Sequence, residues 1–233
     1  MFLHGMPLDG RMWTAQAQAF PGALVVPSLY ALGDSIEEWA EAALAITAST
    51  ALVVVGSSCG GSCALEMARM RPERIAGLVL VGSKAAHHPE PGLRDRYIAS
   101  LRHGGIASLW RDIGHRYFGP TSPPASAAQG LAWALEQSTG DLVRGTAAFH
   151  SRPDASDVVA QWRQPLTVIV GEHDGFVSVP KARLLASTAP NAMCHVVPGA
   201  GHFPNLDAPG IFNDLLRRAV ERCVTAPRPL QPT

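Results

Sequence analysis

Short, unbroken apolar runs recur along the chain and predict the strands of a parallel sheet. They are rich in Val, Ile and Leu, as expected of strands that are buried on both faces, and they lie at residues 23–26, 51–55, 75–81, 166–170 and 193–197. Helix-forming segments alternate with them, at residues 35–47 (with Ser35 as N-cap), 64–69, 179–187 and 211–224. Because strand, helix and strand follow one another within residues 51–81, the pattern indicates βαβ units and an α/β fold.

Residues 84–160 interrupt this alternation. They contain glycine and proline pairs and several aromatic residues but no strand-like run, and residues 93–102 and 127–137 have the pattern of helices. We therefore expect a helical insertion between two strands. The predicted division is a core of residues 1–83 and 161–226, an insertion of residues 84–160, and a loose, proline-rich tail at residues 227–233.

Composition narrows the classes of protein. Hydrophobic residues make up 47% and charged residues 16% of the 233 residues, which indicates a globular protein with one large core. The formal net charge is zero and Lys and Arg do not cluster, so no nucleic-acid partner is expected. No apolar run is long enough to span a membrane and no secretory signal is evident, while four cysteines without CxxC spacing favour free thiols in a cytoplasmic protein.

The candidate nucleophile is Ser58, in the sequence Gly-Ser-Ser-Cys-Gly at residues 56–60. This G-x-S-x-G pattern lies between a predicted strand and a predicted helix, which is the context of a nucleophile elbow. The sharp turn strains the serine backbone and requires small neighbours, which Gly56, Gly60 and Gly61 provide. Cys59 also fits a small-x-nucleophile-x-small pattern and remains an alternative nucleophile.

A serine hydroxyl needs a base, and His202 is the best candidate. It lies in Gly-Ala-Gly-His-Phe-Pro after the last predicted strand, and Asp174 follows the strand before it. Both therefore lie at the carboxyl edge of the sheet with Ser58, and the order Ser, Asp, His is that of one hydrolase family. Asp174 would fix the imidazole tautomer. The other acidic or basic neighbours, which we interpret as solvated loop residues, are Glu172, His173 and Asp207.

An oxyanion hole needs two backbone N–H groups. The first is predicted at Cys59, the residue after the nucleophile. The second is predicted at Met6, because Gly5 lets the chain turn its next N–H towards a substrate oxygen.

These residues resemble the α/β-hydrolase superfamily over nearly the whole chain, and most closely its small esterase and enol-lactonase branch. The segments that carry the resemblance are residues 3–13, 32–35, 56–61, 151–154, 171–176 and 199–209. It implies a mostly parallel sheet flanked by helices and a helical cap at residues 84–160 over the active site. It implies no cofactor, and no metal-ligand cluster is present in the sequence. Family members usually carry further strands before the His-Gly segment, so we expect either that the N-terminal edge strands are missing here or that this sequence begins inside a longer chain.

The predicted function is hydrolysis of a carboxylic ester or lactone of a small molecule through an acyl-enzyme. A thioesterase, a C–C hydrolase and a cyclase or lyase with the same triad remain alternatives, as does a non-catalytic binding protein. Arg94, Arg96, Arg102 and Arg111 in the cap fit a carrier-protein thioesterase. The candidate pocket residues are His4, Trp110, Tyr117, Phe118, Trp133 and Phe149, with His115 and His150 as further polar candidates; the sequence leaves the natural substrate and the oligomeric state open.

Overall fold

The computed structural model describes residues 1–20, 22 and 24–226. Within this part of the chain, five strands form one parallel sheet whose order follows the sequence. The strands are β1 (Phe2–Leu3), β2 (Leu52–Ser57), β3 (Ile75–Val81), β4 (Leu166–Gly171) and β5 (Ala192–Val197). The α/β class and the four longer predicted strands are confirmed.

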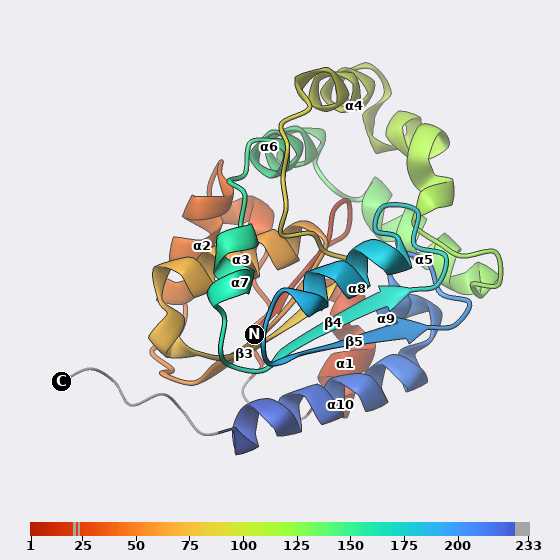
Figure 1. Cartoon of the computed structure of the whole chain (residues 1–233). Coiled ribbons are helices and arrows are strands. Elements are labelled where there is room, and N and C mark those ends of the chain that lie inside the picture. Colours follow the sequence, from red (N-terminus) through yellow and green to blue (C-terminus); the bar gives the residue numbers. More distant parts are fainter. Residues whose placement is uncertain (21, 23, 227–233) are drawn as a thin grey trace.

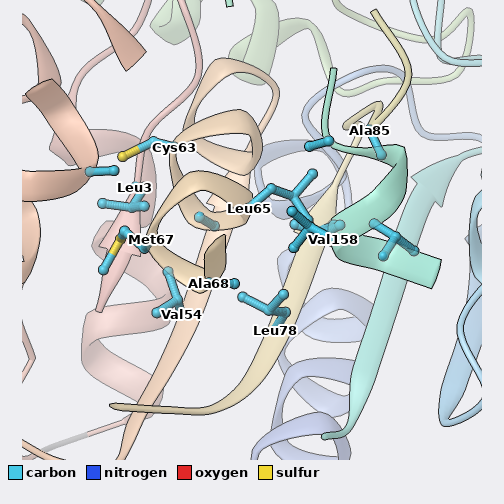
Figure 2. Packing of buried hydrophobic residues seen from close by; sticks show 14 of the residues in the cluster. Leu3, Val54, Cys63, Leu65, Met67, Ala68, Leu78, Ala85 and Val158 are labelled. Carbon is cyan, nitrogen blue, oxygen red and sulfur yellow. The ribbon is translucent and has the colours of Figure 1, made fainter. Parts of the chain in front are cut away.

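The side chains of the central strands alternate between two hydrophobic cores. Val54 and Leu78 pack in the core on one face of the sheet, whereas Val55 and Val79 pack in the core on the other face. Figure 2 shows the first core, where Val54 and Leu78 lie near Leu65 and other buried side chains. Because both faces are covered, these strands are apolar at nearly every position, which is why their runs are unbroken in the sequence.

Helices cover both faces of the sheet (Figure 1). The first core is covered mainly by α2 (Ile36–Ala45), α3 (Cys59–Met70), α7 (Ser156–Gln161) and α8 (Val179–Ser187). On the other face, α1 (Thr14–Ala19) packs against α10 (Pro209–Thr225), near the short α9 (Pro204–Asp207). Four 3₁₀ turns complete this description: η1 (Gly10–Trp13), η2 (Leu29–Ala31), η3 (Pro72–Arg74) and η4 (Gly114–Arg116). The side chain of Ser35 accepts a hydrogen bond from the N–H of Glu38, so the predicted N-cap of α2 is confirmed.

The predicted insertion consists of helices between β3 and β4. They are α4 (Pro91–Ile113), α5 (Pro124–Leu135) and α6 (Thr139–His150); in Figure 1, α4 and α6 lie above the sheet and α5 lies to the right, near the tip of β4. α4 is much longer than predicted, because a second helical stretch follows directly after a kink at Gly104 and Gly105, where the backbone leaves helical φ and ψ. α6 was not predicted. Residue 160, the predicted end of the insertion, falls inside α7, whose Val158 and Val159 pack in the first core.

One predicted strand is wrong. The backbone at residues 24–26 forms no strand, although Val25 accepts one hydrogen bond from the N–H of Phe2 at 2.8 Å. Pro27 follows directly and has no N–H to extend such a ladder. Residue 23 and the predicted tail at residues 227–233 lie outside the described residues.

Candidate active site

Ser58 occupies a strained turn between β2 and α3. Its φ of 52° and ψ of −114° make it the one non-glycine residue with positive φ among the described residues. Glycines surround it because the backbone leaves no room for side chains. A Cβ on Gly56 would meet the carbonyl of Gly60, and a Cβ on Gly60 would meet the carbonyl of Leu3. The turn thus holds Ser58 at the N-terminus of a helix, whose dipole stabilises negative charge.

His202 and Asp174 form a buried pair at the carboxyl edge of the sheet. The imidazole Nδ1 lies 2.9 Å from each carboxylate oxygen of Asp174, and the two side chains are 2% and 0% exposed. Oδ1 of Asp174 also accepts hydrogen bonds from the N–H groups of Phe176 at 2.8 Å and Val177 at 2.9 Å. Burial by itself raises the pKa of Asp174, but the charge of His202 and these hydrogen bonds outweigh it and lower the pKa. An ionised carboxylate here assigns the proton to Nδ1 and leaves Nε2 free to act as a base.

The loop that carries His202 is held by the segment of the insertion that lies between η4 and α5. The N–H of His202 donates to the carbonyl of Tyr117 at 2.7 Å, and the hydroxyl of Thr121 donates to the carbonyl of Gly199 at 3.0 Å. The rings of Tyr117 and Phe203 stack at 5.3 Å with an interplanar angle of 4°. The cap therefore positions the imidazole as well as covering it.

The other ionisable groups of these two loops have structural contacts. Asp207 accepts a hydrogen bond from the N–H of Gly201 at 2.7 Å, and Glu172 accepts one from the N–H of Gly199 at 2.9 Å. His173 lies 3.8 Å from Glu172, and both side chains are exposed. The imidazole of His202 is hydrogen-bonded to Asp174 and to neither of the other two acids.

The predicted oxyanion loop lies directly beside Ser58. A Cβ on Gly5 would lie 3.3 Å from the Cβ of Ser58, and Met6 lines the same cavity as Ser58 and His202. The thiol of Cys59 is fully buried and donates to the carbonyl of His4 at 3.6 Å. Burial raises the pKa of this thiol to about 12, so it stays protonated and unreactive. These contacts favour Ser58 over Cys59 as the nucleophile.

Ser58 and His202 open into one cavity of about 350 Å³. Among the described residues no hydrogen bond joins the Ser58 hydroxyl to the imidazole of His202, whose Nδ1 is bonded to Asp174. Much of the wall is an apolar stripe of α4, with Leu93, Tyr97 and Leu101 at intervals of four residues. These three residues were not among the predicted pocket residues, although their spacing was a usable signal.

Only some of the predicted pocket residues line this cavity. Tyr117, Phe149 and His150 line the cavity. The other candidates, which do not line it, are His4, Trp110, His115, Phe118 and Trp133.

Each aromatic candidate that the structure removes from the pocket packs elsewhere. Trp110 stacks on Tyr117 at 5.4 Å and lies behind it, and Phe118 packs against Phe203 at 6.1 Å. Trp133 lies under the guanidinium of Arg11 at 5.9 Å. His4 is buried and accepts a hydrogen bond from the N–H of Leu29 at 2.9 Å through Nε2, and burial lowers its pKa to about 4. His4 thus supports the oxyanion loop from behind.

The described residues contain no group of three or more His, Cys, Asp or Glu side chains arranged to hold a metal ion. In the same part of the chain, no helix combines the length and the apolar character needed to cross a membrane.

A family model described as "Alpha/beta hydrolase family" matches residues 1–215, so the chain belongs to this family. A pimeloyl-[acyl-carrier protein] methyl ester esterase of Aromatoleum aromaticum is 29% identical, with 90% of this chain and 92% of that protein covered. The enzyme of the same name from Serratia marcescens is 28% identical, with 91% of this chain and 89% of that protein covered. The family and these relatives together identify the chain as an ester-hydrolysing enzyme.

Solved structures share this fold. A thermophilic esterase from Thermogutta terrifontis superposes with a TM-score of 0.83 at 23% identity, and covers 96% of this chain and 89% of that one. The enol-lactonase from Burkholderia xenovorans LB400 superposes with a TM-score of 0.82 at 18% identity, and the superposition covers 94% of this chain and 90% of that one. At this level of identity the likeness establishes the α/β-hydrolase fold.

Proposed function

We propose that the protein is a serine hydrolase that cleaves carboxylic esters through an acyl-enzyme, with Ser58 as nucleophile, His202 as general base and Asp174 as its orienting acid. The observation that carries this proposal is the arrangement of these three side chains. Ser58 stands on a positive-φ turn at a helix N-terminus and shares one cavity with His202, whose Nδ1 is held by Asp174 at 2.9 Å.

The proposed reaction begins when Nε2 of His202 takes the proton of the Ser58 hydroxyl. The serine oxygen attacks the ester carbonyl, and the N–H groups of Met6 and Cys59 stabilise the oxyanion that develops. His202 then gives its proton to the leaving alcohol, and the carbonyl re-forms as the acyl-enzyme. Water, activated by the same imidazole, hydrolyses the acyl-enzyme and releases the acid and free Ser58.

The test is hydrolysis of a series of p-nitrophenyl esters by the wild type and by Ser58→Ala. We expect a burst of p-nitrophenol followed by steady turnover, and loss of both in the variant. A fluorophosphonate probe is expected to label the wild type only. Turnover that persists in Ser58→Ala would disprove the assignment of the nucleophile, and an unlabelled, inactive wild type would favour a binding protein on a hydrolase scaffold.

For the substrate, we propose a methyl ester at the end of an acyl chain. Two observations support it: the named relatives are methyl ester esterases, and the apolar stripe of α4 suits a hydrocarbon chain. The arginines Arg96, Arg102 and Arg111 are exposed on α4 and would suit an acidic carrier protein to which that chain is attached. A comparison of free and carrier-bound methyl esters tests this, and preferential cleavage of the carrier thioester would instead favour a thioesterase.

A further inference from the structure

The cavity contains a buried cation that the proposed mechanism does not use. Arg152 is 8% exposed and lines the same cavity as Ser58. Its Nη1 donates to the carbonyl of Phe149 at 2.7 Å, and the guanidinium lies 4.0 Å over the ring of the same residue. Its Nε is buried and has no hydrogen-bond partner among the described residues. These contacts hold the guanidinium in place but provide no negatively charged partner for it.

A buried arginine in this state is unusual. The guanidinium carries five N–H donors, and buried charges are normally paired and fully hydrogen-bonded. Burial lowers the pKa of Arg152 to about 10, so the group is still protonated at neutral pH. An unpaired cation on a cavity wall is stabilised when a ligand supplies the missing negative charge.

The acids closest to Arg152 are engaged elsewhere. The two oxygens of Asp154 accept hydrogen bonds from the N–H groups of His87 at 2.7 Å and Ser156 at 2.9 Å. Glu66 pairs with Arg69 at 3.1 Å. A separate void of about 10 Å³ also borders Arg152, and a space of this size offers room for at most about one water. One water cannot satisfy all the remaining N–H donors of the guanidinium, so donors are left for a ligand in the cavity.

Other basic groups line the same cavity. They include Lys84, whose side chain is exposed, and the imidazole of His150, whose pKa burial and the charge of Arg152 lower to about 4. The acidic residue among the described lining residues is Glu90, which is exposed. Arg116 also lines the cavity, but its guanidinium donates to the carbonyl of Gly175 at 3.0 Å. The balance of charge in the cavity is positive.

We propose that Arg152 and Lys84 form an anion subsite, which holds a carboxylate or phosphate group of the substrate while Ser58 attacks the ester bond. The proposal rests on the proposed function, because it places the second group of a substrate whose ester is cleaved in this cavity. The substrate class is therefore an ester that carries a separate anionic group, joined to it by a hydrocarbon chain that contacts the apolar wall. The planar fork of Arg152 suits both anions, and Lys84 adds a point charge.

The experiment compares two sets of substrates of equal chain length. The first set comprises monomethyl esters of α,ω-dicarboxylic acids, and the second comprises methyl esters of the corresponding monocarboxylic acids, which are neutral. We expect the wild type to prefer the anionic ester at one chain length by about tenfold or more in kcat/KM, mainly through KM. This preference is expected to fall about tenfold in Arg152→Met and in Lys84→Met. Arg163→Met is the control, because it removes an exposed cation that does not line the cavity and should keep the preference.

The variants and a third substrate set make the outcome decisive. If Arg152→Met does not fold, the exposed Lys84 still provides the test. Esters with an ω-phosphate in place of the carboxylate identify which anion the subsite takes, since the better of the two is the native chemistry. Equal kcat/KM for anionic and neutral esters, or a preference that survives in Lys84→Met and Arg152→Met, would overturn the subsite while leaving the esterase proposal intact.

If no ester is cleaved at all, the proposed function fails separately. The subsite is then judged by calorimetric titration of the α,ω-dicarboxylates into Ser58→Ala. Binding that weakens about tenfold when Lys84→Met is added supports the subsite, and the absence of binding overturns it.

Discussion

Gly82 offers a sharp test of the histidine–aspartate pair. It follows β3 directly, and its φ is 53°. A Cβ at this position would lie 2.9 Å from Nδ1 of His202 and 3.0 Å from Oδ2 of Asp174. The N–H of Gly82 donates to the carbonyl of Ile169 at 2.9 Å, so the backbone cannot retreat without breaking a bond to β4. Gly82→Ala must therefore push the pair apart or displace it.

Two effects are expected, and they can be separated. A non-glycine residue in the left-handed region lowers the free energy of unfolding by about 1–2 kcal/mol, which corresponds to a drop in Tm of about 2–4 °C per kcal/mol for a chain of this size. Displacement of the imidazole adds a loss of kcat, about 100-fold for a shift of about 1 Å and less for a smaller one. Gly105→Ala is the matched control for strain: its φ is 60°, and the nearest heavy atom, Oγ1 of Thr139, would be 3.6 Å from the new Cβ.

The assay is p-nitrophenyl acetate hydrolysis, with urea unfolding of both variants at the same pH. We expect similar losses of stability in Gly82→Ala and Gly105→Ala, and a large loss of kcat in Gly82→Ala alone. Equal kcat values in the two variants would refute the reasoning, because the crowded pair would then have no part in the reaction.

Three further predictions concern single side chains. Asp174→Asn should lower kcat by about 10³- to 10⁴-fold with little change in KM, because an amide no longer enforces the Nδ1–H tautomer of His202; steady-state kinetics with the ester series checks this. Cys59→Ala should keep kcat within a few-fold, since the thiol is buried and the proposed oxyanion donor is the backbone N–H, and iodoacetamide should leave the wild type active; inactivation by the reagent would contradict this. Burial lowers the pKa of His4 from 6.5 to about 4, so the unfolded chain binds more protons than the folded protein between these values. Stability should therefore decline by up to about 3 kcal/mol as the pH falls through this window, and urea unfolding of His4→Gln should show a shallower decline.

The sequence was sufficient for most of the fold because the signals were local. The runs at β2, β3 and β4 are apolar at both faces, and a parallel sheet covered on both sides imposes that pattern directly. α6 was missed although it carries a local signal, the N-cap Ser138, whose side chain accepts a hydrogen bond from the N–H of Asp141. The segment at residues 24–26 has strand-like residues but a single ladder bond, since Pro27 ends the pairing.

The candidate triad was also accessible from the sequence, because each member follows a strand of the same sheet and parallel strands bring their carboxyl ends to one edge. Only the tertiary structure showed the side-chain geometry that supports Ser58 over Cys59. The thiol of Cys59 is buried, and His202 forms a buried contact with Asp174.

The cavity depended on tertiary structure altogether. Trp110 and Trp133 are aromatic residues of the same insertion as Tyr117 and Phe149, so the sequence alone does not distinguish them. Only Tyr117 and Phe149 line the cavity. Which aromatic side chains of the cap turn inward is decided by how the helices pack on the core and on one another. The sequence by itself thus determined the strands, the elbow and the order of the candidate catalytic residues, because these follow from backbone sterics and burial. Tertiary packing decided the walls of the cavity and left the charge of Arg152 unpaired there, because both arise from contacts between segments that lie far apart in the chain.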